Sequence, residues 1–291
     1  MNRYEIRKED RSTSSMRIAS QLFKKDILNG IWSNRWKYLF VTVFFSVITT
    51  INLYNFNSHP SLNGEKVQFN LFDIIFSVFR GNDPTDPFSK IIWLMVQLLA
   101  VFIVGSYSDK ALVDGGIYSL IRAGSRSAWW YSKTIYVLFS VTLYYLIGFS
   151  TVIMITDLAS PLASDWSSYA EAFELPRMNQ SISSWLFVAY CFVLLTTSSI
   201  AISMIHLTLM QIMKPIYSYI GIVTILFVSL FYESSYLPGE HSMIMKHTLF
   251  MDSGLMMIGT MIYNSFLTGI CLIIGARLFH RKDIFVKSDI D

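Results

Sequence analysis

One glycine-interrupted segment, residues 108–133, contains the side chains whose types and order most clearly suggest a function. Its sequence is SYSDKALVDGGIYSLIRAGSRSAWWYSK. The order of glycine and apolar residues predicts a short helix at about residues 116–122, a turn at Gly124, and a new helix capped by Ser125 or Ser127. A short helix joined rigidly to two longer ones can transmit force from a soluble partner, so this segment suggests mechanical coupling rather than bond chemistry.

Motifs that would make the chain an enzyme are missing from the sequence. It has no Gly-Lys dipeptide, hence no Walker A loop to hold phosphates, and no HExxH or GxSxG sequence. Of the five histidines, only His241 and His247 form a close pair, with Glu240 and Asp252 nearby. Two solvated histidines are favoured over a metal site for this pair. We therefore predict no catalytic residue, metal or cofactor in this chain.

The elements that position the segment are strongly apolar. Apolar residues make up 53% of the 291 residues, charged residues only 15%, and the mean hydropathy is +0.45, whereas a soluble chain is about 25% charged. A compact soluble domain cannot hide so much apolar surface. The composition excludes a soluble enzyme, a disordered chain and a nucleic-acid-binding domain. The predicted partner is therefore the lipid bilayer, and no nucleic acid is expected to bind.

Six apolar stretches are long enough to cross a bilayer, which takes about 20 residues in a helix. None contains Lys, Arg, Asp or Glu, any of which would cost about 2.5–3.5 kcal/mol at the centre of the membrane. The stretches are 38–56, 91–107, 134–155, 185–209, 216–232 and 255–276. We therefore predict an all-α polytopic membrane protein with six transmembrane helices.

Two shorter apolar stretches are not expected to span the membrane. Residues 67–79 place Asn70, Asp73 and Ser77 on one side at helical spacing. This predicts an amphipathic helix that lies on the membrane interface or dips into it. Residues 243–251 are similar but are broken by a lysine and a histidine.

The basic residues indicate how the spans are oriented. Most of the 23 Lys and Arg residues lie in the two ends of the chain and in the second and fourth loops. The opposite side has only Lys66, Arg80, Lys90, Arg177 and Lys246. Because cytoplasmic loops are enriched in Lys and Arg, both termini are predicted to be cytoplasmic.

The chain is predicted to form one six-span membrane domain over residues 16–279. Residues 1–15 are charged and Ser-rich and are expected to be disordered. Residues 16–36 have apolar side chains at spacings of three and four, which predicts an amphipathic elbow helix; a charged flank without a special role is the alternative. The outer loops are 57–90, 157–184 and 233–254, none of them large enough for a domain, and 280–291 form a cytoplasmic tail.

Polar residues inside the spans are candidates for lining a transport pathway. They are Thr42, Ser46, Thr49, Asn52, Gln97 and Asn264. Packing against a neighbouring helix explains the first four equally well, and interhelical hydrogen bonds are the favoured explanation for the last two. The six runs contain no acidic or basic residue, which argues against a carrier driven by protons or sodium ions.

Segment 108–133 resembles the loop between the second and third spans of permease subunits of type-2 ABC exporters. That family has roughly Glu-x-Gly-Thr, an apolar helix, Ser-Arg, and a Lys before the third span. The corresponding residues here are Asp114-Gly-Gly-Ile117, Leu120-Ile121, Ser125-Arg126 and Lys133. This chain departs from the family pattern at two positions: Asp114 stands in place of the usual Glu, and Ile117 in place of Thr. The layout of elbow helix, six spans and a re-entrant helical element between the fifth and sixth spans is also similar. The Arg-Ala-Gly-Ser-Arg and Trp-Trp sequences are similar to permeases of Firmicutes peptide-antibiotic export and immunity systems.

The resemblance implies a dimeric exporter in the bacterial cytoplasmic membrane that moves an amphipathic peptide, a lipid-linked molecule or a drug. Two copies of a separate ATPase subunit would bind ATP and Mg, and a second permease chain, identical or homologous, would complete the pathway. The residues implied to couple to the ATPase are Asp114, Gly115, Gly116, Leu120, Ile121, Arg122, Ser125, Arg126 and Lys133. The alternative is that these basic residues only follow the positive-inside rule.

Two other functions are weighed against export. A membrane immunity or sensor protein would bind a peptide with its outer loops and transport nothing, and the acidic stretch 157–174 would be its binding face. An intramembrane enzyme would need convergent catalytic residues inside the membrane, and the sequence has none.

Overall fold

The computed structural model describes residues 3–58, 68–83, 86–113, 126–159, 165–179 and 182–281, which form helices and loops without a strand. The helices are α1 (Arg3–Ser58), α2 (Leu71–Phe79), α3 (Pro87–Val113), α5 (Arg126–Ala159), α6 (Ser184–Leu209), α7 (Pro215–Phe231) and α8 (Met257–Arg281). A π-helical turn (Ala170–Glu174) and three 3-10 turns (Leu175–Arg177, Glu240–Ser242 and Ile244–Lys246) lie in the connections.

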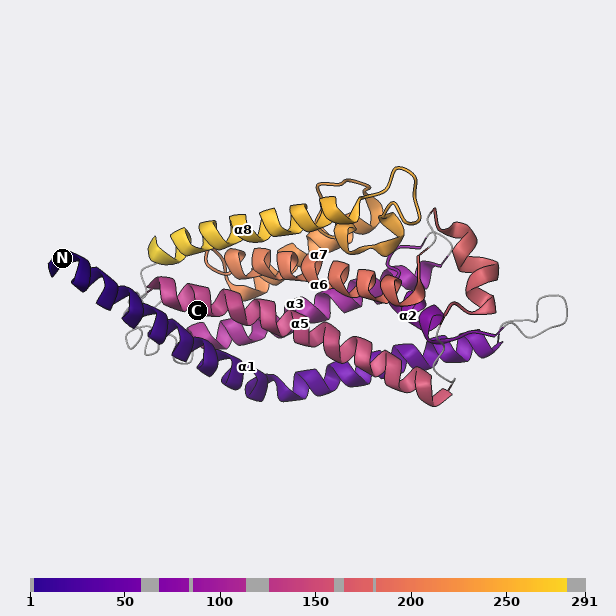
Figure 1. Cartoon of the computed structure of the whole chain (residues 1–291), viewed down its shortest axis with the longest axis horizontal. Helices are drawn as coiled ribbons and strands as arrows, with labels where there is room; N and C mark the ends of the chain where they lie inside the picture. Colours follow the sequence, from indigo (N-terminus) through magenta and orange to yellow (C-terminus); the bar gives the residue numbers. More distant parts are fainter. Residues whose placement is uncertain are drawn as a thin grey trace.

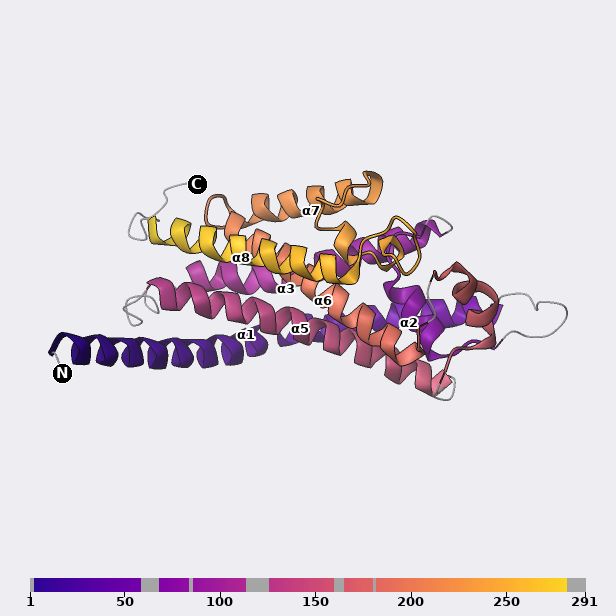
Figure 2. The same ribbon diagram turned by 45° about the horizontal axis from the view of Figure 1, so that its top comes forward.

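The long helices lie side by side along the longest axis of the molecule (Figure 1). In the turned view, α7 forms one edge of the bundle, and the first half of α1 forms the opposite edge before α5 crosses it (Figure 2). Five helical segments are long and apolar enough to cross a membrane: Asn34–Ser58, Pro87–Ser106, Arg126–Ala159, Ser184–Leu209 and Met257–Arg281. The architecture is that of an all-α polytopic membrane protein, as the composition predicts.

Helix α7 is the shortest of the long helices. Its 17 residues extend about 26 Å at a rise of about 1.5 Å per residue. The hydrocarbon core of a bilayer is about 30 Å thick. Proline occupies the first position of this helix, where its missing N–H costs no hydrogen bond.

Apolar side chains cover the outside of the bundle as well as its inside. On α1, Val41 and Phe45 are buried, whereas Phe40, Val43 and Val47 on the opposite face are exposed. Lipid tails are as apolar as these side chains, so the helices must be held together by close packing and hydrogen bonds.

Glycines allow α1 and α5 to approach closely. A Cβ atom added at Gly148 of α5 would lie 2.7 Å from the ring of Phe45, and one added at Gly30 of α1 would lie 2.2 Å from the ring of Tyr136. The side-chain amide of Asn34 also donates a hydrogen bond to the hydroxyl of Tyr136 at 3.1 Å. The two helices therefore pack together at two separate levels.

Helix α1 is continuous from Arg3 to Ser58. The structure thus differs from the expectation of a disordered start at residues 1–15 and a separate elbow helix at residues 16–36. The physical reason is that this stretch contains no proline and a single glycine, so nothing in it breaks the helix before the chain approaches Pro60.

Helix α2 lies within the bundle, with all nine of its residues buried. Its start is closed by a capping box, in which the Asn70 side chain accepts from the N–H of Phe72 at 2.9 Å and the Asp73 carboxylate accepts from the N–H of Asn70 at 2.6 Å. Because all of α2 is enclosed by other parts of the chain, it does not expose the polar side that the amphipathic pattern predicts. Its place relative to the membrane interface stays a prediction. Two of the polar residues that made it look amphipathic are used to cap it.

Candidate functional site

We call the end of the bundle where α3 ends and α5 begins the loop end. The coupling residues implied by the family resemblance fall, in the sequence, after α3 and in the first turns of α5. Seven of them, Asp114, Gly115, Gly116, Leu120, Ile121, Arg122 and Ser125, lie outside the described residues. Arg126 and Lys133 are described, and both lie in the first turns of α5.

The start of α5 is fastened to the end of α8. The guanidinium of Arg126 donates to the carbonyl of His280 at 2.5 Å, and the Trp129 ring stacks on Phe279 with centroids 4.5 Å apart and planes 9° apart. The indole N–H of Trp130 donates to the carbonyl of Leu272 at 3.0 Å. These contacts fix the first turns of α5 against α8.

Lys133 is buried, with 2% of its surface exposed, and its Nζ lies 5.2 Å from the centroid of the Trp129 ring. A cation above an indole face is stabilised by the electrons of the ring. In this chain Lys133 therefore packs inside the bundle, and its role in coupling would be to position α5.

The end of α3 is fastened to α1. The Lys37 Nζ donates to the hydroxyl of Ser106 and lies 5.0 Å from the centroid of the Phe102 ring. The end of α3 and the start of α5 are therefore both attached to other helices of the bundle, α1 and α8.

Polar side chains in the middle of the bundle form a closed ring across α3, α5 and α6. Gln97 donates to the hydroxyl of Tyr145 at 3.3 Å, and Ser199 donates to the Gln97 carbonyl at 2.6 Å. The two hydroxyls of Tyr145 and Ser199 are 2.7 Å apart, so the proton of Tyr145 completes the ring. Gln97 thus makes the interhelical hydrogen bonds that packing predicts.

The candidate pathway residues are dispersed. The hydroxyls of Thr42, Ser46 and Thr49 donate to carbonyls of α1 itself, four residues earlier, and Thr42 is exposed on the outside of the bundle. Asn52 accepts from the Ser77 hydroxyl of α2 at 2.5 Å. Among the described residues, none of these hydrogen bonds joins the four side chains to the Gln97 ring. Their part in a pathway stays a prediction.

Asn264 belongs to a second interhelical network. Its amide donates to the hydroxyl of Ser198 at 2.9 Å, and Ser198 donates to the carbonyl of His241 at 2.9 Å. This network joins α6 and α8 to the loop that precedes α8. Asn264 therefore makes the interhelical hydrogen bond favoured from its sequence position.

The histidine pair is buried, so the expectation of two solvated side chains is wrong. His241 Nδ1 and His247 Nε2 lie 3.0 and 3.1 Å from the same hydroxyl, that of Thr260. The other ring nitrogens face the carbonyls of Ser235 and Met243, so each must carry its proton there. Burial lowers the pKa of His247 to about 4, which keeps its ring neutral at neutral pH.

A metal is not required to explain the pair. Among the described residues, no group of three or more His, Cys, Asp or Glu side chains is arranged to hold a metal ion. The loop folds inward because 3-10 turns place both rings beside Thr260, a packing that the six-residue spacing does not reveal.

At the opposite end of the bundle, residues 68–83, 165–179 and 233–256 pack together into an assembly that we call the α2 cap (Figure 1). The N–H of Tyr169 donates to the carbonyl of Gln68 at 3.1 Å, and the N–H of Asn179 donates to the carbonyl of Leu249 at 2.8 Å. Three connections that are each too short for a domain thus form one assembly.

Glycine is needed where two parts of the α2 cap cross. Gly81 has a φ of 85°, and a Cβ atom there would lie 2.9 Å from the Cα atom of Met243. A residue with a side chain would be strained both by the backbone angle and by this contact. The glycine therefore allows the loop after α2 to lie against the connection that leads to α8.

The α2 cap contains a cluster of ion pairs. Arg80 contacts Asp83 at 2.9 Å and also pairs with Asp86, while Arg177 contacts Asp83 at 3.0 Å and Glu174 at 3.7 Å. Asp83 is fully buried at the centre of the cluster. Buried charges of this kind need such partners to offset their lost hydration.

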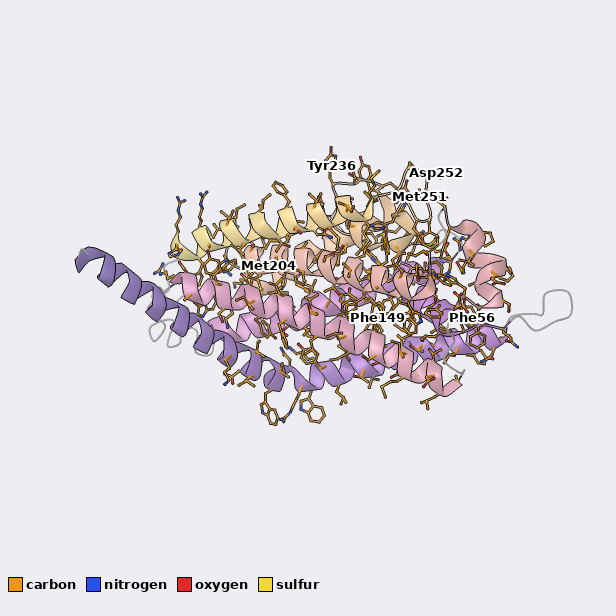
Figure 3. The ribbon with its side chains drawn as sticks, viewed as in Figure 1. Phe56, Phe149, Met204, Tyr236, Met251 and Asp252 are labelled. Atoms are coloured by element: carbon orange, nitrogen blue, oxygen red, sulfur yellow. The ribbon has the colours of Figure 1, made fainter. Side chains whose placement is uncertain are left out.

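A cavity of about 560 Å³ opens beside this cluster. It is lined by Asn52, Asn55, Phe56, Ser58, Ser77, Arg80, Asp86, Tyr169 and Glu174. Phe56 lies near the last turns of α1 at this end of the bundle (Figure 3). The volume is within the usual range for small-molecule sites, about 300–1,000 Å³.

Most of the cavity residues are absent from the sequence-derived candidates. The sequence indicates Asn52 as a pathway residue and Ser77 as part of a polar helix side, and Glu174 lies in the acidic stretch proposed as a peptide-binding face. Arg80 and Arg177 carried a signal, because they are basic residues in the loops predicted to be outer, which are otherwise poor in Lys and Arg. Their partners are not recognisable without the fold.

Comparison of the chain with protein-family models, characterised proteins and solved structures finds no match. The site must therefore be interpreted from its own residues.

Proposed function

We propose that the chain is the membrane subunit of an ATP-driven exporter of the ABC-2 type, with the 108–133 loop seated on a separate ATPase subunit. The observation that supports this most directly is the attachment of the first turns of α5 to α8 through Arg126, Trp129 and Trp130. A loop that transmits force needs firmly held helices on both sides. Here α3, before the loop, is attached to α1, and α5, after the loop, is attached to α8.

In the proposed arrangement, α7 is the fifth of six spans, α8 is the sixth, and both termini are cytoplasmic. The loop end then faces the cytoplasm of a bacterial cell, where two ATPase subunits bind ATP and Mg. A second permease chain, identical or homologous, forms the pathway together with this one. Closure of the ATPase pair would push on the loops and shift the bundle between two states. The cargo is an amphipathic peptide, a lipid-linked molecule or a drug.

The test is a pull-down of the tagged full chain in mild detergent from its native host, after crosslinking. We expect the wild type to retain a protein with a Walker A motif and the Asp114→Arg/Arg126→Glu variant to lose it. Leu120→Asp provides a second variant, because it disrupts the apolar part of the loop without touching Arg126 and its bond to α8.

Asp252→Arg is the matched control, because it makes the same charge change as Asp114→Arg in an exposed residue of the α2 cap (Figure 3). It should retain the ATPase as the wild type does. If the stably folded wild type retains no ATPase even after crosslinking, the exporter proposal fails.

The second candidate is a membrane immunity or sensor protein that binds a peptide without transporting it. The α2 cap favours it, since the outer connections form one assembly with a cavity. An absent ATPase would make this candidate the first choice.

A further inference from the structure

The cavity beside the α2 cap contains a buried carboxylate with free hydrogen-bonding capacity. Glu174 has 6% of its surface exposed and lines the cavity. Its Oε2 is buried and, among the described residues, accepts no hydrogen bond, although Arg177 lies 3.7 Å away. A buried carboxylate oxygen without a donor is costly unless something else pairs with it.

The charges around the cavity are unbalanced. Glu174 faces Asp73 of α2, Arg80 and Asp83 from the loop after α2, and Arg177 from the next turn. Asp86, directly before α3, lines the cavity too.

Four carboxyl groups therefore surround two guanidinium groups. Asp83 and Asp86 form the shorter ion pairs with these guanidinium groups, Arg177 lies 3.7 Å from Glu174, and the Arg80 Nε has no acceptor among the described residues. Helix α1 adds only uncharged residues to the walls. The carboxyl groups outnumber the guanidinium groups, so the net charge around the cavity is negative when they are ionised. Such a cavity would repel an anion and attract a cation.

The remaining walls suit an organic cation better than a bare metal ion. Phe56 and Tyr169 meet edge to face with ring centroids 4.9 Å apart, and aromatic faces attract ammonium and guanidinium groups. Asn52 and Asn55 add side-chain amides to the walls, and the Asn52 oxygen already accepts from Ser77. A metal ion would need several converging oxygens, and the described residues show no such group.

We propose that this cavity binds a small organic cation, with its ammonium or guanidinium group against the Glu174 carboxylate and its apolar part against Phe56 and Tyr169. The site is built from one chain and does not depend on the exporter proposal.

Binding is coupled to protonation of Glu174. Burial raises the pKa of this carboxyl to about 7, against an ordinary value of 4.5, with Arg177 and Arg80 opposing the rise and Asp83 and Asp73 adding to it. A bound cation favours the ionised form, so it must displace the proton when Glu174 is protonated. Affinity therefore rises with pH up to about 7, by at most about tenfold per pH unit, and then levels off.

The test is calorimetric titration of the full chain in nanodiscs with benzylamine, using benzyl alcohol as the neutral analogue. We expect benzylamine to bind at pH 8 and benzyl alcohol to bind more weakly. Glu174→Gln keeps the shape of the side chain without its charge. It should weaken benzylamine binding by about tenfold or more and abolish the pH dependence.

Glu171→Gln is the matched control, since Glu171 lies on the same turn but is exposed. The affinity of this variant for benzylamine should stay within about twofold of that of the wild type. The proposal is overturned if benzylamine does not bind, if benzyl alcohol binds as tightly, if Glu174→Gln binds like the wild type, or if Ca²⁺ binds and displaces benzylamine. The pull-down of an ATPase is unaffected by any of these outcomes, so the two proposals fail separately.

Discussion

Glu174 illustrates how a single residue can lower the stability of the folded chain while providing a binding group. Its carboxylate is buried, and burial dominates over the attraction of Arg177 and Arg80, so the pKa is raised. Residues held in unfavourable surroundings often serve a function, because a sequence selected for stability alone would replace them.

The first prediction at this scale is that Glu174→Gln stabilises the chain at high pH. The unfolded carboxyl loses its proton near pH 4.5 and the folded one near pH 7. Between these values the folded state holds more protons than the unfolded state, so the stability of the wild type falls as pH rises. Glutamine at position 174 does not titrate, so the variant does not lose this stability as pH rises.

Thermal unfolding in detergent measures the effect. The variant should match the wild type near pH 4 and exceed it at pH 8, with a difference on the order of 3 kcal/mol at most. A variant that is less stable than the wild type at pH 8 would show that the ion pair with Arg177 outweighs the cost of burial.

At the scale of elements, the seam between α5 and α8 is the joint that matters most for the proposed coupling. Trp130 is fully buried in this seam, and it reaches α8 because Gly275 leaves room for its ring. A Cβ atom at Gly275 would lie 2.1 Å from Cζ2 of Trp130, and a ring so enclosed cannot move aside.

We therefore expect Gly275→Ala to open the seam and lower the midpoint of thermal unfolding, with a cost of about 1–3 kcal/mol. Gly269→Ala on the same helix is the control, because a Cβ atom there meets nothing within 4 Å. Both changes gain the same helix propensity. Equal stability of the two variants would mean that the α5 and α8 backbones are not held at this distance.

At the scale of the whole molecule, the open question is how the bundle sits in the membrane. The distribution of basic residues predicts that the loop end faces the cytoplasm and the α2 cap faces outward. The exporter proposal depends on this orientation, because a coupling loop must meet an ATPase in the cytoplasm.

Thiol labelling of intact cells tests the orientation. The native cysteines, Cys191 and Cys271, are buried and give little background. A membrane-impermeant maleimide should label Tyr236→Cys, whose side chain is 86% exposed in the α2 cap (Figure 3). Arg281→Cys at the end of α8 should be labelled only after the cells are permeabilised. The reverse pattern would invert the predicted topology.

Part of the candidate site follows from local sequence and part does not. Gln97 and Asn264 were recognisable because an amide in an apolar run must find a partner on another helix. The burial of His241 and His247 was not recognisable from the sequence, because a loop that folds inward can have the same composition as one that faces water. Glu174 was visible only as one acid among several in its loop.

The sequence by itself determined the class of the protein, because the preference of a charge-free apolar run for lipid is a property of the run alone. It also determined where the glycine-interrupted loop lies between two such runs. Only the tertiary structure decided that α2 is enclosed by the other helices and that a cavity with a buried carboxylate lies beside it. The contacts that build this cavity join residues far apart in the chain, such as Arg177 and Asp83, which are 94 positions apart. Partners at such separations are set by how the helices pack, and no local pattern records them.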